Sequence, residues 1–331
     1  MDLTTRYMGL ELKNPLVASA SPLNADLGNL RRLEECGAAA VVLPSVFEEQ
    51  IEAERQSYEG LAMANAESFP EAQTFFPEYG LRDVGAGRYL DYLRRAVEAV
   101  RIPVIASLNG TTAEGWIAYA RQVEEAGARG LELNVYFIPT DLTMTSQAVE
   151  QRYLDIVRAV REVVTIPIAV KLSPYFSAFG NMATELDRAG ADALVLFNRF
   201  YQPDIDLVQL RMHNDLNLSD RNEIRLPLLW VAVLSGRVNA SLAASTGVET
   251  ADEVLKYILA GAHVVMTTSA LLRHGVEYVG SLLSGVESWL AARGFQSLDD
   301  VRGMLSHQRL GTAADFERVN YMEILRGFRA P

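Results

Sequence analysis

Short apolar runs recur along this chain, each preceded by Gly and Ala. The pattern appears in ECGAAAVVL (35–43), EAGARGLELN (125–134), RAGADALVLFN (188–198) and LAGAHVVM (259–266). A glycine just past a helix can adopt the left-handed conformation that ends the helix, and the chain then turns tightly into a strand. The repeat therefore predicts a series of helix-to-strand joints.

Proline marks a second kind of joint, in VRIPVIASL (100–108) and VTIPIAVKL (164–172). Proline stops the preceding helix and favours an extended entry into the next segment. With the glycine joints, these signals predict eight short strands: Leu16–Ala20, Ala40–Leu43, Val104–Leu108, Leu131–Asn134, Ile168–Lys171, Ala193–Phe197, Ser241–Ala244 and Val264–Thr267.

Segments with apolar residues at helical spacing separate these strands, as in Ala113–Ala126, Gln147–Val163 and Ala251–Leu259. The strands are nearly all apolar, which is typical of a parallel sheet that is covered on both faces. We therefore predict an α/β fold, a (β/α)₈ TIM barrel. An open doubly wound sheet would carry a glycine-rich fingerprint after its first strand, and SASPLNADLG (19–28) is not one.

The predicted loops differ in length, with long insertions after the second strand (Pro44–Gly87), the fourth (Val135–Thr145) and the sixth (Asn198 to about Leu226). Loops on that face of a barrel build the active site. No low-complexity linker divides the chain, so we predict one domain over residues 1–331, with a C-terminal helical extension from Ser297 to Pro331.

Composition narrows the class of protein. The chain has 49% hydrophobic residues, as in an ordinary globular protein, and its net charge of −12 opposes binding to nucleic acid. The apolar run PLLWVAVL (227–234) is too short to span a membrane, and the N-terminus lacks the features of a secretory signal. One cysteine, Cys36, and four scattered histidines argue against a metal site. We expect a cytoplasmic protein.

Lys171 ends the fifth predicted strand, in IAVKLSPYF. A lysine at the carboxyl end of an apolar barrel strand must pair with an acid or face a ligand. One interpretation is a salt bridge with a neighbouring strand-end carboxylate. The other is a cation placed against an anionic group, such as the reduced isoalloxazine of a flavin.

The last two strands lead into AASTGVETADEV (243–254) and MTTSALL (266–272), which offer Gly247 and several hydroxyl groups. These loops bind phosphate in many barrels, although Thr250 and the other hydroxyls can also serve routine helix capping. Three asparagines, Asn109, Asn134 and Asn198, end other strands. Their amides suit the edge of a heterocycle, and a single such asparagine is more often a turn former.

Four segments resemble the class 1 dihydroorotate dehydrogenases, which are FMN-containing (β/α)₈ barrels: NPLVASASPL (14–23), LELN (131–134), AVKLSPYF (169–176) and STGVETADEVLKYILAGAHVVMTTSAL (245–271). The resemblance implies FMN, a small-molecule substrate and a homodimer. By position, it implies that Lys171 contacts the flavin and that Asn134 lies beside it. The other implied cofactor-binding residues are Ser19, Ala20, Ser45, Thr246, Gly247, Thr268 and Ser269. From the strand-end asparagines, we predict Asn109 as a further cofactor-binding residue and Asn134 and Asn198 as substrate-binding residues.

The chain departs from the family at several expected contacts, both where the substrate would be handled and at a phosphate loop. The family's catalytic base is a Cys or Ser, and Phe137 stands in its place. Pro44 replaces a lysine, Pro139 replaces an asparagine, and Arg199 stands where a small hydroxyl residue is usual. The glycine-rich phosphate loop before the sixth helix has become EIRLPLLW (223–230).

Tyr136 is the remaining candidate for proton transfer near Phe137. Phenols ordinarily have a pKa of about 10, so a tyrosine is a weak base at neutral pH unless a cation such as Lys171 lowers that value. The alternative role for Tyr136 is an aromatic wall against flavin or substrate.

Three functional hypotheses remain: dihydroorotate oxidation with a replaced base, oxidation of another substrate on the same flavin, and ligand or partner binding without turnover. We predict an FMN-dependent oxidoreductase that acts on a CH–CH group. The chain has no cysteine set for an iron–sulfur cluster and no nicotinamide fingerprint, so its sequence does not identify an electron acceptor.

Overall fold

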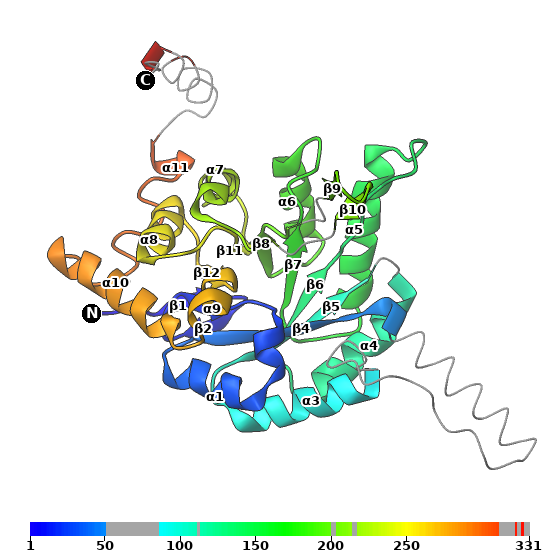
Figure 1. The fold of residues 1–331 in the computed structure, drawn as a ribbon, viewed down its shortest axis with the longest axis horizontal. Helices are drawn as coiled ribbons and strands as arrows, with labels where there is room; N and C mark the ends of the chain where they lie inside the picture. Colours follow the sequence, from blue (N-terminus) through cyan, green and yellow to red (C-terminus); the bar gives the residue numbers. More distant parts are fainter. Residues whose placement is uncertain are drawn as a thin grey trace, which may run out of the picture.

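The structure is a computed structural model that describes residues 1–50, 86–110, 113–199, 203–213 and 217–310, together with 322, 326 and 327. Within these residues, eight parallel strands close into a barrel, and each pairs with the next along the chain (Figure 1). The strands are β3 (Leu16–Ala18), β4 (Ala40–Phe47), β5 (Val104–Asn109), β6 (Gly130–Asn134), β7 (Ile168–Leu172), β8 (Ala193–Leu196), β11 (Ser241–Ala244) and β12 (Val264–Thr267). The TIM-barrel prediction is confirmed, with every predicted strand at its expected place.

Helices surround the barrel and bury its outer face (Figure 1). The longer ones are α1 (Leu27–Glu35), α3 (Ala86–Ala99), α4 (Ala113–Glu125), α5 (Ser146–Arg161), α6 (Phe179–Arg188), α7 (Arg225–Leu234), α8 (Ala251–Ala260) and α10 (Tyr278–Ala292). Shorter helical turns are η1 (Pro22–Ala25), η2 (Arg221–Ile224), α9 (Ser269–His274) and α11 (His307–Leu310). The glycines of the four repeated joints all have positive φ, between 95° and 119°, as the sequence pattern predicts.

An antiparallel hairpin that the sequence analysis did not anticipate closes the amino-terminal end of the barrel. Its strands are β1 (Thr5–Tyr7) and β2 (Leu10–Leu12), and its Tyr7 and Met8 join the apolar cluster inside the barrel. The Met8 amide donates to Ser241 Oγ at the start of β11, and Thr5 Oγ1 donates to the carbonyl of His263 beside β12. A cavity within the barrel can therefore open only toward the carboxyl ends of the strands.

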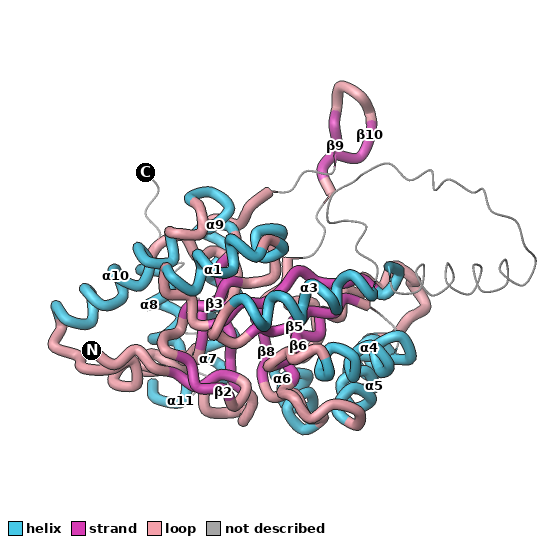
Figure 2. Tube along the Cα trace, turned by 90° about the horizontal axis from the view of Figure 1, so that it is seen from below, coloured by secondary structure: helices cyan, strands magenta, loops and turns pink. Residues whose placement is uncertain are grey.

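The long insertions are described only in part. Residues 51–85 of the predicted insertion after β4 lie outside the described residues, and so do residues 311–321, 323–325 and 328–331 of the predicted C-terminal extension. After β8, the chain forms a second antiparallel hairpin, β9 (Asp204–Asp206) and β10 (Arg211–His213), which projects away from the barrel (Figure 2). No helix in the described parts of the chain is long and apolar enough to cross a membrane.

The lowered pKa of His263 should make the free energy of unfolding depend on pH. Burial, followed by the nearby Arg302 charge, lowers its pKa to about 4, and its Nδ1 accepts a hydrogen bond from the Leu242 amide. An unfolded histidine titrates near ~6.5, so the unfolded chain binds more protons between these two values. We expect the free energy of unfolding to fall by up to about 3 kcal/mol as the pH drops from 6.5 to 4.

Urea unfolding across this pH range, with His263→Asn as the comparison, tests the prediction. Asparagine keeps an acceptor but cannot take up the proton. An equally steep pH dependence in the variant would show that another group causes it.

Candidate functional site

Three predicted site residues lie side by side at the carboxyl ends of neighbouring strands. Asn109, Asn134 and Lys171 are register partners across β5, β6 and β7. Asn198 follows β8, and its amide nitrogen donates to Asn134 Oδ1 at 2.7 Å. Closure of the barrel therefore gathers residues that are up to 89 positions apart in the sequence onto one rim.

Lys171 pairs with an acid, which is one of the two roles that its sequence position left open. Its Nζ lies 3.5 Å from Oε1 of Glu132 and 3.5 Å from Ser19 Oγ. The Glu132 side chain is only 1% exposed and that of Lys171 11%, so this is a buried ion pair. Lys171 also lines a cavity at the carboxyl end of the barrel, so the ammonium is held from below and faces open space above.

Sequence reasoning missed Glu132 as a site residue. The available signal was a lone carboxylate in an apolar strand, two positions before Asn134 and therefore on the same face. Its second oxygen, Oε2, is buried without a hydrogen-bond partner among the described residues. The carboxylate thus retains the capacity to accept a further hydrogen bond.

We call the cavity above Lys171 the polar cavity; its volume is about 290 Å³. It extends from Lys171 to the loops that follow β11 and β12. The predicted residues that line it are Ser19, Ala20, Lys171, Asn198, Thr246, Gly247, Thr268 and Ser269. The structure thus brings together most of the predicted cofactor-binding residues.

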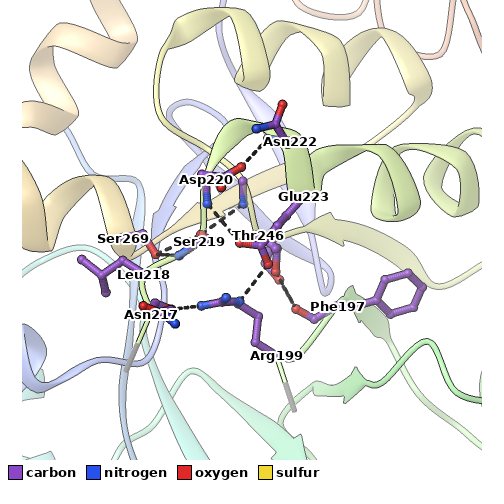
Figure 3. A network of polar contacts seen from close by, with 12 residues as sticks. Phe197, Arg199, Asn217, Leu218, Ser219, Asp220, Asn222, Glu223, Thr246 and Ser269 are labelled. Atoms are coloured by element: carbon purple, nitrogen blue, oxygen red, sulfur yellow. Dashed lines mark hydrogen bonds and ion pairs between the residues drawn. The ribbon is translucent and has the colours of Figure 1, made fainter. Parts of the chain in front are cut away.

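Ser219, from the insertion after β8, also lines the polar cavity. It belongs to the network of polar contacts drawn in Figure 3. Its Oγ lies 2.9 Å from Ser269 Oγ and accepts a hydrogen bond of 3.3 Å from the Gly247 amide. The neighbouring Thr246 instead donates its hydroxyl to the carbonyl of Phe197. Nothing in the local sequence around Ser219 indicates this position, since it lies 28 residues from Gly247.

The polar cavity fits a cofactor that carries phosphate and hydroxyl groups. Thr267 Oγ1, from the end of β12, is buried without a partner in the described parts of the chain, and Thr267 lines the cavity. Serine hydroxyls and a loop amide gather at the far end, where a phosphate would need donors. Arg199 also lines the cavity. Its guanidinium forms an ion pair with Glu223 at 3.0 Å and donates a hydrogen bond to the carbonyl of Asn217 (Figure 3).

A second cavity, which we call the apolar cavity, adjoins the first and has a volume of about 490 Å³. The two share Ala20, Ser21 and Pro22 in their walls. The predicted residues Ser45, Asn109 and Asn134 line the apolar cavity. Ser45 Oγ lies 2.7 Å from Ser107 Oγ, so a hydroxyl pair crosses from β4 to β5.

The loop after β6 turns away from both cavities. The Phe137 ring lies under the guanidinium of Arg152 on α5, 4.1 Å from ring centre to Cζ. Tyr153 anchors the same loop by donating its hydroxyl to the carbonyl of Val135. Tyr136 is half-buried, and neither it nor Phe137 belongs to the walls of the two cavities. The aromatic wall considered for Tyr136 is therefore not seen at these cavities.

The closed barrel of eight parallel strands with flanking helices defines the class of protein, a (β/α)₈ barrel whose candidate site lies at the carboxyl ends of the strands. The chain belongs to the dihydroorotate dehydrogenase family, because the family model described as "Dihydroorotate dehydrogenase" matches residues 2–290. The resemblance seen in the sequence is thereby confirmed.

Curated relatives cover nearly the whole chain. A protein of Aeropyrum pernix named "Putative dihydroorotate dehydrogenase A (fumarate)" is 28% identical over 91% of this chain and 97% of its own length. The "Dihydroorotate dehydrogenase B (NAD(+)), catalytic subunit" of Methanothermobacter thermautotrophicus is 26% identical over 91% and 98%. The "NAD-dependent dihydropyrimidine dehydrogenase subunit PreA" of Escherichia coli K12 is 24% identical over 96% and 80%.

The buried ion pair makes a prediction about stability. Glu132→Ala should destabilise the fold by about 3–5 kcal/mol, because it leaves the Lys171 ammonium buried without a counter-charge. The double variant Glu132→Leu/Lys171→Met should recover much of this loss, since it removes both charges. Urea unfolding measures both variants, and equal loss in the single and the double variant would contradict a coupled pair.

The backbone conformation at Gly247 leads to a second prediction about stability. This residue has φ of +74°, and an added Cβ would lie 2.8 Å from the backbone nitrogen of Ile224 in η2. Gly294 is a matched control, with φ of +78° and nothing within 4 Å of an added Cβ. Gly294→Ala should cost about 1 kcal/mol of stability for its backbone conformation alone, and Gly247→Ala distinctly more. Equal losses in urea unfolding would show that the close approach of η2 is unimportant.

Proposed function

We propose that the polar cavity binds FMN and that the chain is an FMN-dependent dehydrogenase, which oxidises a CH–CH bond in a small molecule. The observation that carries the proposal is the placement of the Lys171 ammonium. It is buried against Glu132 at one end of a cavity whose other end is rich in hydroxyl and amide donors. Family membership supports the same conclusion.

The polar cavity has groups for each part of this cofactor. The Gly247 amide and the hydroxyls of Ser219 and Ser269, which are hydrogen-bonded to one another in this structure, would turn to the phosphate, together with the Thr268 hydroxyl. Ser19 and Ala20 border the cavity beside Lys171 and would lie along the ring. Asn109, Asn134 and Ser45 would meet the ring or the substrate from the adjoining apolar cavity.

When bound, FMN would accept a hydride from the substrate. Lys171 would stabilise the negative charge that the ring gains, because a fixed ammonium in a partly buried site interacts strongly with a nearby anion. Glu132 holds this ammonium in place from the barrel interior. Asn134 and Asn198, joined by a hydrogen bond, would orient the substrate with their remaining polar atoms.

The residue that takes the substrate proton must differ from the family's Cys or Ser base, because Phe137 stands in that place. Phe137 has no titratable group. Burial raises the pKa of Tyr89 and of Tyr92 far above the ordinary value for a phenol, so these two tyrosines stay protonated and act as donors. We assign proton transfer to Tyr136, which lies outside both cavities in this structure and would have to move with the loop after β6 to reach the substrate.

The names of the relatives narrow the candidates for the substrate and for the electron acceptor of this chain. The relatives are named as dihydroorotate and dihydropyrimidine dehydrogenases, and the same names mention fumarate, NAD(+) or NAD. A ring compound with a saturated CH–CH bond is the substrate class we assign here, and dihydroorotate and a dihydropyrimidine are the two members to test. A homodimer in the cytoplasm completes the proposal, and its acceptor can be a small molecule or a partner subunit.

The cofactor assignment predicts a yellow protein and a role for Lys171 that can be measured. Purified protein should contain FMN in a ratio near one, and Lys171→Met should lower the midpoint potential of the bound flavin by about 30–60 mV. A charged hydrogen bond is worth about 1.5–3 kcal/mol, and 30 mV corresponds to about 1.4 kcal/mol in a two-electron couple.

Lys256→Met is the matched control, because Lys256 pairs with Glu253 on α8 and lies outside both cavities. Its potential should equal that of the unchanged protein. A colourless protein that does not take up added FMN would refute the cofactor assignment.

A further inference from the structure

The apolar cavity lies where a substrate would meet the cofactor. It shares Ala20, Ser21 and Pro22 with the polar cavity, and its Asn134 is hydrogen-bonded to Asn198 in the wall of the polar cavity. A molecule inside it would therefore lie beside the end of the polar cavity that holds Lys171. Its volume of about 490 Å³ is within the usual range for sites that bind small molecules.

Aromatic and aliphatic groups form most of the wall of this cavity. Val46 and Tyr89 are almost completely buried beneath it, and the Phe47 side chain stands at the end of β4. The two tyrosines in the wall use their hydroxyls within the protein. Tyr92 donates to the carbonyl of Asn24 at 2.7 Å, and Tyr89 accepts the Ser107 amide at 3.0 Å. Both therefore contribute mainly ring surface to the cavity.

The polar groups that remain in the wall are mostly uncharged. They include the amides of Asn109 and Asn134 and the hydroxyl of Ser45, which is already paired with Ser107. Among the described lining residues, the one cation is Arg88, an exposed residue in the first turn of α3. Lys171 lines the other cavity, where Glu132 already offsets its charge.

We propose that the apolar cavity selects an uncharged ring compound with one carbonyl or amide edge, and that it discriminates against the same ring bearing a carboxylate. The edge would meet Asn109 and Asn134, whose amides can donate and accept. A carboxylate would lose its hydration against the apolar wall without gaining a buried cation from the lining residues that the structure describes. The identification of this occupant as the substrate rests on the proposed function, whereas the selectivity for a neutral ring does not.

The competing arrangement is an anionic ring whose carboxylate reaches Arg88 at the mouth. The exposure of Arg88 disfavours it, because an ion pair in water contributes little to affinity. The neutral occupant uses the buried surface of the cavity, and the anionic one would have to leave its charged group outside.

A matched pair of probes decides between these arrangements. Benzamide and benzoate have the same ring and nearly the same size, and they differ in charge. Isothermal titration calorimetry of the full-length purified protein at neutral pH should show benzamide binding at least 10-fold more tightly than benzoate. Benzoate binding as tightly as benzamide, or neither probe binding at millimolar concentration, would overturn the proposal.

Two variants tie the result to this cavity. Phe47→Ala should weaken benzamide binding about 3- to 10-fold, because it removes a ring from the wall. Leu142→Ala is the control, since Leu142 is 99% exposed in the loop after β6 and outside both cavities; it should bind benzamide as the unchanged protein does. Equal affinity of Phe47→Ala and the control would place the probe elsewhere.

Pro44→Lys adds an ammonium to the cavity wall and should raise benzoate affinity at least 10-fold without a matching gain for benzamide. Thermal unfolding of this variant establishes that it is folded. If benzoate already binds the unchanged protein tightly and Arg88→Ala abolishes that binding, the anionic arrangement holds and the proposal is wrong.

The visible spectrum of the same preparation separates this proposal from the proposed function. Selective benzamide binding by a protein without flavin would support the neutral cavity and refute the FMN assignment. Preference for benzoate in a flavin-loaded protein would refute the neutral cavity and leave the FMN assignment intact.

Discussion

The buried pair of Lys171 and Glu132 is the constraint on which the rest of the site depends. Two charges inside a barrel are tolerated only when they meet each other and when the surrounding side chains leave room for them. Glu132 is in register with Ala169 on β7, and Ala169 with Ala193 on β8, so small side chains occupy its layer of the barrel. One layer higher, Asn134 is in register with Lys171. A register shift of one residue would move both charges to the outer face, against the helices.

Two adjoining cavities of different chemistry make up the site around this pair. The side toward β11 and β12 offers hydroxyls, a loop amide and a buried Thr267 hydroxyl with no partner in the described chain, all of which suit a phosphate-bearing cofactor. The side toward β4 and α3 is largely apolar. Some of the chain's departures from the dihydroorotate dehydrogenase family lie within β4, at Pro44, and in the loop after β6, at Phe137 and Pro139. Others, Arg199 and the segment 223–230, lie after β8, and Arg199 lines the polar cavity.

The packing of Phe137 shows how such a departure is accommodated. A ring that replaces a polar residue at an active-site loop would expose apolar surface or fill the cavity. Here Arg152 covers the ring, and Tyr153 fixes the start of the loop through the carbonyl of Val135. The loop is therefore stabilised by α5, and the cavities remain open without it.

The barrel itself could be predicted from the sequence, because its signals are local. Glycine with positive φ ends the helices at the repeated joints, proline starts β5 and β7, and apolar runs supply the strands. The shared rim of Asn109, Asn134 and Lys171 also followed, since parallel strands present their carboxyl ends on one face. Only the tertiary structure decided the partner of Lys171, the place of Ser219 beside Gly247, the plug formed by β1 and β2, and the separation of two cavities. These features depend on strand register and barrel closure, which bring together side chains that no local pattern in the sequence connects.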